Sequence, residues 1–246
     1  MIGFDRPIRP QWIHESLLLW RADTPLRDFH ESFNQIAHEL SGREGKRKVR
    51  TVLFRYFFDF SGHAPNQITS KQSLLSTIAA NSTLDELKPT YLIILIDRAT
   101  VLQEILSSLM RLFSFGKQII TKQLVDNIVE LHGERDVVQR SARSFLMTLV
   151  FFGILKKKGI NYEWNEKMTC SPKALAYALL FFSLDNGRVE VDIRELRQDS
   201  RFSLINLENL EDCVRQYNGV LWSYIRRPLT AKFMIHQDAS EKVVQI

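Results

Sequence analysis

Apolar residues recur at helical spacing along the N-terminal half of the chain. From residue 26 to residue 40 they step by three or four positions, which predicts an amphipathic helix (Leu26, Phe29, Phe33, Ile36 and Leu40). The preceding Asp23-Thr24-Pro25 has the composition of a helix start. The same spacing predicts helices over residues 12–20, 45–60 and 70–81, with a loop over residues 62–69.

The next segment is apolar on nearly all sides. Tyr91–Ile96 has no polar face, so we expect a central core helix that runs without a break from Pro89 to about Phe115. Gly116 is expected to end it.

The middle of the chain has the order of elements that is typical of a winged helix-turn-helix. Thr121 is expected to cap a helix over residues 122–131, and His132-Gly133 is expected to form a tight turn. A second helix should run from about Arg135 to Phe152, with its buried positions three or four residues apart (Val138, Ala142, Phe145, Leu149 and Phe152). A basic turn and a strand over residues 160–164 complete a hairpin. Helix, glycine turn, helix and hairpin together predict a winged helix-turn-helix.

The C-terminal part mixes helices with strands. A helix is expected from Ser171-Pro172 to residue 182, then a strand over residues 189–193, a helix over 207–217 and strands over 220–225 and 229–236. This order allows a second, degenerate winged helix, whose last helix carries acids that would repel phosphate (Glu208, Glu211 and Asp212). We therefore predict a mainly α protein: a helical domain over residues 1–115, the winged helix-turn-helix over 116–169, and an α+β module over 170–246.

Composition bounds the class of protein. The chain has 246 residues, of which 45% are hydrophobic, which is too many for a disordered protein. The two cysteines, Cys170 and Cys213, form no CxxC motif, so neither a disulfide scaffold nor a thiolate zinc knuckle is expected. The N-terminus has no secretory signal, and the longest apolar run is too short to span a bilayer. These features predict a cytoplasmic protein with no membrane partner.

Positive charge is concentrated in two short stretches. The chain carries a net charge of +5. Residues 43–55 hold six basic residues against one acid, and residues 135–158 again hold six against one. The two stretches together carry twice the net charge, so the remainder of the chain is acidic. A focused positive field of this kind favours a polyanionic partner.

The basic stretches supply the candidate nucleic-acid-binding residues. On the second helix of the helix-turn-helix, four polar residues could reach base edges or phosphates (Gln139, Arg140, Arg143 and Ser144). Three lysines at the hairpin tip could follow the phosphate backbone (Lys156, Lys157 and Lys158). A further basic cluster lies at the start of the helix over residues 45–60 (Arg43, Lys46, Arg47, Lys48 and Arg50). This cluster fits equally well a helix start whose charges are only solvated by water.

Sequence patterns of catalysis are weak. Asp85-Glu86 with Lys88, and Glu190 with Asp192, loosely suggest a metal-dependent nuclease, but the first group lies at a helix start and the second lacks a following lysine. His30 and His38 lie eight residues apart without a third ligand. We therefore expect no enzyme activity, no cofactor and no metal site.

Several short segments resemble the BrxA family of bacterial BREX phage-defence systems. They are Gln11-Trp-Ile-His-Glu-Ser-Leu-Leu-Leu19, Gly45-Lys-Arg-Lys-Val-Arg50, Ile94 with Asp97-Arg98, and Arg140-Ser-Ala-Arg-Ser-Phe-Leu followed by Phe151-Phe-Gly-Ile-Leu155. The resemblance covers about residues 11–180, and the chain after Ser183 extends beyond it. It implies a non-catalytic nucleic-acid binder whose helical part is similar to the antitermination factor NusB, working in host defence beside a methyltransferase and an ATPase.

Three functions follow as hypotheses. The first is binding of double-stranded DNA through the winged helix-turn-helix. The second is a protein-interaction scaffold that uses the winged helix and the acidic tail. The third is RNA binding through the basic cluster of residues 43–55, which the NusB likeness favours.

Overall fold

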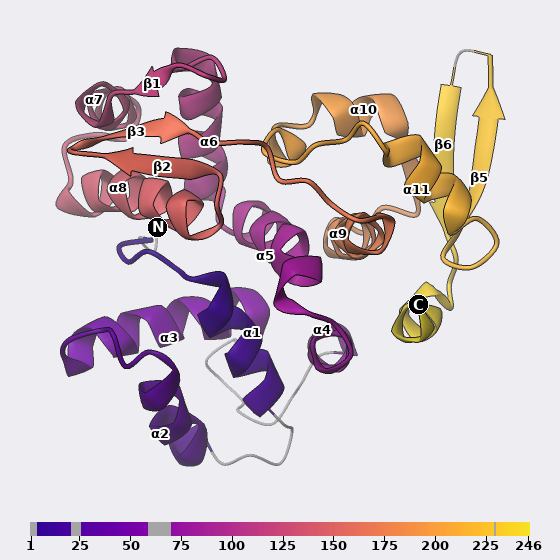
Figure 1. Cartoon of the computed structure of the whole chain (residues 1–246), viewed down its shortest axis with the longest axis horizontal. Coiled ribbons are helices and arrows are strands. Elements are labelled where there is room, and N and C mark those ends of the chain that lie inside the picture. The colour runs from indigo at the N-terminus through magenta and orange to yellow at the C-terminus, as the bar shows by residue number, and fades with distance from the viewer. Residues whose placement is uncertain (1–3, 21–25, 59–69, 229) are drawn as a thin grey trace.

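The protein is mainly helical and contains two small antiparallel sheets (Figure 1). The computed structural model describes residues 4–20, 26–58, 70–228 and 230–246. The helix start expected at residues 23–25, the helix end expected near residue 60 and the loop expected over residues 62–69 lie outside these residues. Among the described helices, none is long and apolar enough to cross a membrane.

Four helices lie in the described part of the N-terminal region, at the positions predicted from apolar spacing, except that α2 ends at Ile36 and not at Leu40. They are α1 (Pro10–Leu19), α2 (Leu26–Ile36), α3 (Arg43–Phe57) and α4 (Ser70–Ala80). Pro10 occupies the first turn of α1, where a missing N–H costs nothing. Aromatic side chains pack between α1, α2 and α3. The Trp20 ring, at the end of α1, contacts the rings of Phe29 and Phe54 edge to face, with 5.2 and 5.6 Å between ring centroids.

The prediction of a single helix from Pro89 to Phe115 is wrong, because the helix is interrupted at Ala99. The structure has α5 (Leu84–Arg98) and α6 (Thr100–Leu112), separated by Ala99 in an extended conformation (φ −111°, ψ 90°). Apolar positions keep their spacing across the break, so the pattern carries no sign of it. The start also lies earlier: the Thr83 hydroxyl accepts from the Glu86 N–H and the Glu86 carboxylate accepts from the Thr83 N–H, a capping box.

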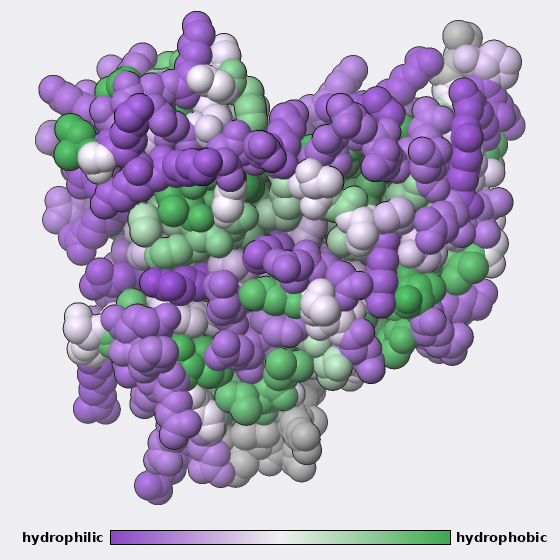
Figure 2. All heavy atoms as spheres, in the orientation of Figure 1, coloured by the Kyte–Doolittle hydropathy of each residue, from purple (hydrophilic) through white to green (hydrophobic). Residues whose placement is uncertain are grey.

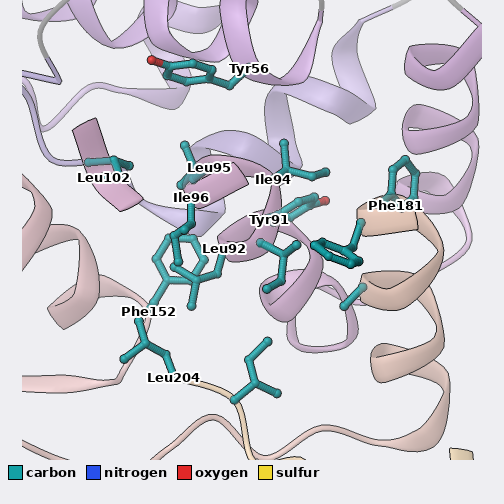
Figure 3. Close-up of a cluster of buried hydrophobic side chains, with 14 of the residues drawn as sticks. Tyr56, Tyr91, Leu92, Ile94, Leu95, Ile96, Leu102, Phe152, Phe181 and Leu204 are labelled. Atoms are coloured by element: carbon teal, nitrogen blue, oxygen red, sulfur yellow. The ribbon is translucent and has the colours of Figure 1, made fainter. Parts of the chain in front are cut away.

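The core position of α5 is confirmed. Residues 91–96 are all buried, and one continuous cluster of buried side chains includes them. Figure 3 shows side chains from several elements converging on α5, among them Tyr56 of α3 and Leu102 of α6, with Phe152, Phe181 and Leu204 from later in the chain. The helix therefore joins parts of the protein that are distant in sequence.

The middle part contains a helix pair and a three-stranded sheet. The helices are α7 (Thr121–His132) and α8 (Asp136–Phe151), and the strands are β1 (Gln118–Ile119), β2 (Leu155–Lys158) and β3 (Asn161–Trp164). The sheet has the order β1-β3-β2 and is antiparallel. The five positions expected to face the core on α8 are all buried, which confirms its register.

Thr121 does not cap α7 as expected. The N-cap residue is Ile120, which gives no side-chain cap. The Thr121 hydroxyl instead donates to the Ile160 carbonyl at 2.6 Å, and the Thr121 N–H donates to the Asn161 side-chain oxygen at 3.1 Å. These bonds fasten the tip of the β2–β3 hairpin to the start of α7.

The C-terminal part holds α9 (Pro172–Asp185) and a second three-stranded sheet. Its strands are β4 (Glu190–Asp192), β5 (Trp222–Arg227) and β6 (Thr230–Ile235), with α11 (Leu210–Gln216) before the hairpin. The Ser171 hydroxyl caps α9 by accepting from the Ala174 N–H, as expected for a Ser-Pro helix start. The sequence pattern missed four short helical elements of three to six residues: α10 (Ile193–Gln198), η1 (Ser200–Phe202), α12 (Ala239–Lys242) and η2 (Val243–Gln245).

The middle and C-terminal parts share one order of elements. The first runs α6, β1, α7, α8, β2, β3, and the second runs α9, β4, α10, α11, β5, β6, with η1 inserted before α11. Each sheet places its third strand between the first and the second, as β1-β3-β2 and β4-β6-β5. The chain therefore contains the same helix–strand–helix–helix–hairpin arrangement twice.

Ion pairs connect the end of α5 to the C-terminal part. Arg98 donates to both carboxylate oxygens of Asp185 at 2.8 Å. Arg201 pairs with Asp97 and with Asp199, and all of these side chains are mostly buried. Burial opposes ionisation of the Asp199 carboxyl, but hydrogen bonds from Arg201 outweigh it and lower the pKa of Asp199.

This shift predicts a pH-dependent effect of Asp199→Asn on stability. A folded-state pKa below the unfolded value stabilises the protein above the unfolded pKa of about 3.9, and the effect is lost as the pH falls through the folded pKa. We expect the variant to lose about 1 kcal/mol of unfolding free energy at about pH 7 and less near pH 3. Urea unfolding at both pH values measures this. An equal loss at the two pH values would contradict the ionic role of Asp199.

Candidate nucleic-acid interface

A groove lies between α7, the first turns of α8 and the β2–β3 hairpin. Its volume is about 870 Å³. Apolar side chains that include Val125, Val129 and Tyr162 form part of its lining. Its charged lining consists of three basic residues and two acids (Lys122, Arg143, Lys157, Asp126 and Glu134). The groove thus has an apolar floor and a net positive rim.

Two of the four predicted α8 residues share this groove. Gln139 and Arg143 lie four positions apart, one helical turn, and both line it. Arg143 is exposed and makes no hydrogen bond or ion pair with any residue that the structure describes. Its guanidinium is therefore available to a partner.

Arg140 has a different environment on the same helix. Its guanidinium donates to the Asp136 carboxylate at 3.0 Å, one turn earlier, and both side chains are exposed. The Asp136 carboxylate offsets the Arg140 charge, so the two arginines of α8 are not equivalent. Exposed ion pairs of this kind contribute little to stability.

Ser144 does not lie on the polar face, contrary to expectation. Its side chain is 7% exposed, and its carbonyl accepts from the Thr148 hydroxyl within α8. Five positions after Gln139, the helix has turned this side chain toward the core. Ser144 is therefore removed from the candidate binding residues.

The three hairpin lysines do not point the same way. Lys157 is paired across the hairpin with Tyr162, whose side chain is buried, and it lines the groove. Lys156 and Lys158 alternate to the opposite face of the sheet. There the Lys158 ammonium donates to the Glu163 carboxylate at 2.6 Å. The groove therefore receives one of the three charges.

The basic cluster on α3 is partly neutralised. Arg47 donates two hydrogen bonds to Glu44, and Lys48 pairs with Asp5 at 2.5 Å. Lys46 donates to the Asn34 carbonyl of α2. Burial, followed by the nearby Arg47 and Arg43 charges, lowers the pKa of Arg50. Cationic groups are thus crowded at the start of α3, as the sequence indicated.

Two basic residues near these surfaces were not predicted. Lys122 is exposed and lines the groove. Its position in the sequence could have indicated this, because Lys122 follows Thr121 in the first turn of α7, and this turn borders the groove. Arg6 is exposed on the N-terminal segment, and its charge helps to lower the pKa of Glu44 on α3. No local pattern links Arg6 to α3, because the contact is tertiary.

The cysteines offer no activated thiol. Burial raises the pKa of both the Cys170 and the Cys213 thiol to about 12, so both are protonated near neutral pH. The Cys213 thiol donates to the Pro172 carbonyl at 3.2 Å. Within the described ranges, no three His, Cys, Asp or Glu side chains gather in a way that could hold a metal ion.

Comparison of the chain with protein-family models, with curated proteins and with solved structures finds no match.

Proposed function

We propose that the protein is a non-catalytic binder of double-stranded DNA and that residues 100–164 form a winged helix-turn-helix. The observation that carries the proposal is the groove that holds Gln139, Arg143 and Lys157 between a helix pair and a hairpin. The order α6, β1, α7, α8, β2, β3 and the sheet order β1-β3-β2 support it. Winged helices present their last helix and their hairpin to DNA in this way.

In this proposal α8 enters the major groove with its first two turns. The major groove is about 12 Å wide and an α-helix with its side chains about 10–12 Å across, so the helix fits. The Arg143 guanidinium would donate to the O6 and N7 acceptors of guanine. The Gln139 amide would accept from N6 and donate to N7 of adenine. Lys157, on the hairpin, and Lys122, at the start of α7, also line the groove and would contact phosphates.

The C-terminal repeat is not part of this surface. The helix equivalent to α8 is α11, where Glu211 pairs with both Arg215 and Arg226 and where Asp212 is exposed. The exposed Asp212 carboxylate would repel phosphate, whereas the charge of Glu211 is offset by its two arginines. We propose that this repeat packs and contacts protein partners instead, and the sequence resemblance to the BrxA family suggests that such partners belong to an anti-phage defence system.

A binding titration tests the proposed function. Fluorescence anisotropy with labelled duplex DNA, single-stranded DNA and RNA, each at about 50 and 200 mM salt, gives affinity and its salt dependence. We expect the duplex to bind most tightly, and its affinity to fall at least about 10-fold between the two salt concentrations, because bound phosphates release counterions. Absence of duplex binding at about 50 mM salt would refute the proposal. Preferential RNA binding would assign the basic surface to RNA.

A further inference from the structure

The N-terminal segment ties the second turn of α3 to the last turn of α8. Asp5 pairs with Lys48 of α3 at 2.5 Å between the charged atoms. Three residues later, the buried Ile8 N–H donates to the Thr148 hydroxyl of α8 at 2.9 Å. An extended chain spans at most about 11 Å over three residues. The two helices that carry the basic stretches are therefore held close together by residues 5–8.

The two basic stretches also face the same side of the molecule. In Figure 1 the β2 arrow points to the left edge, where the hairpin tip lies, and α3 begins at the left edge below it. The N-terminal segment lies between them in this view. Figure 2 shows hydrophilic side chains along this edge at the level of both elements.

Contacts and helix periodicity define which α3 charges are free. Lys46 and Lys48 point sideways, toward Asn34 of α2 and Asp5 of the N-terminal segment. Arg43 and Arg47 lie one turn apart on the outer face, and Arg47 is held by Glu44. Arg43 and Arg6 are exposed and make no hydrogen bond or ion pair with any other described residue.

We infer that Arg6 and Arg43 bind phosphates of the same duplex that occupies the α8 groove, at a position displaced along the DNA. This inference rests on the proposed function and extends its footprint from the middle part of the chain to the N-terminal helices. The partner is a polyanion because both free groups are cations, and the nearby Glu44 carboxylate is already held by two hydrogen bonds from Arg47. We take the polyanion to be the duplex because residues 5–8 tie this surface to α8, whose first half lines the groove. Contacts of this kind carry no sequence information and add to the salt dependence.

Duplex length separates this inference from the proposed function. A duplex of about 12 base pairs is roughly 40 Å long and one of about 24 base pairs roughly 80 Å, so the longer leaves more phosphates outside the α8 groove. We compare wild type with Arg6→Ala/Arg43→Ala. The matched control is Arg194→Ala/Arg197→Ala, which removes two exposed arginines from α10. Circular dichroism and thermal melting check that all three proteins fold alike.

On the long duplex at about 100 mM salt, the Arg6/Arg43 variant should bind about 10-fold more weakly, with a salt slope shallower by about 2. On the short duplex the loss should be smaller, within about 3-fold of wild type, because α8 and the hairpin occupy most of its phosphates. The control should match wild type at both lengths. Unchanged binding of the long duplex by the Arg6/Arg43 variant would overturn the inference while leaving the proposed function intact. A loss confined to RNA would also overturn it, and would assign α3 to RNA. Absence of wild-type duplex binding would refute the proposed function, and the inference with it.

Discussion

Phe145→Ala is expected to lower the free energy of unfolding by about 3–5 kcal/mol. The Phe145 side chain is fully buried on the core face of α8. Removing its ring leaves a cavity that the surrounding helices can close only in part, so both transfer free energy and packing are lost. Urea unfolding followed by circular dichroism at 222 nm, where about 1–3 kcal/mol per molar urea is a common slope, measures the change.

The control for this variant lies on the same helix. Arg140→Ala removes an exposed side chain whose partner is Asp136, so its effect on stability should stay within about 0.5 kcal/mol. If Phe145→Ala unfolds like wild type, the register of α8 is wrong and the polar face assigned to it fails as well.

Arg143→Ala is expected to weaken duplex binding by about 1–3 kcal/mol, which is roughly 5-fold to 150-fold. Arg143 lines the groove and is free, whereas Arg140 is held by Asp136. Arg140→Ala should therefore cost less than about 3-fold in affinity, although both variants lose the same charge from the same helix. Anisotropy titrations at one salt concentration compare them directly.

This pair of variants isolates position from charge. If binding depended only on a general electrostatic attraction, Arg140→Ala and Arg143→Ala would reduce the duplex affinity equally. Equal losses would therefore contradict a duplex seated in the groove, and a larger loss from Arg140→Ala would place it on the other side of α8.

Apolar spacing predicted the helices that bury a single face. The positions of α1, α3, α4 and α8 follow from it, because each places a stripe of apolar side chains on the core. The break at Ala99 could not be predicted, because α5 is buried on nearly all of its faces and the apolar positions continue at helical spacing into α6. Short elements such as α10 were missed because six residues do not complete two helical turns.

The candidate site was predicted in part for similar reasons. The sequence located α8 and the hairpin, and hence Gln139, Arg143 and Lys157. Periodicity did not place Ser144, which lies at the border of the buried face. Strand alternation, which sends Lys156 and Lys158 away from the groove, depends on a pairing register that the lysine run itself does not reveal. Arg6 could not be found because its proximity to α3 arises in the folded chain.

Site-specific photocrosslinking tests most directly whether the groove between α7, α8 and the hairpin contacts DNA. Ile160 at the hairpin tip is 85% exposed and Val189 before β4 is 64% exposed, so each can be replaced by p-benzoylphenylalanine without opening the core. We predict that irradiation with a labelled duplex at about 50 mM salt gives an adduct from the Ile160 position that about 500 mM salt abolishes, and no adduct from the Val189 position. An adduct from Val189 with none from Ile160 would contradict the account and move the interface to the C-terminal repeat.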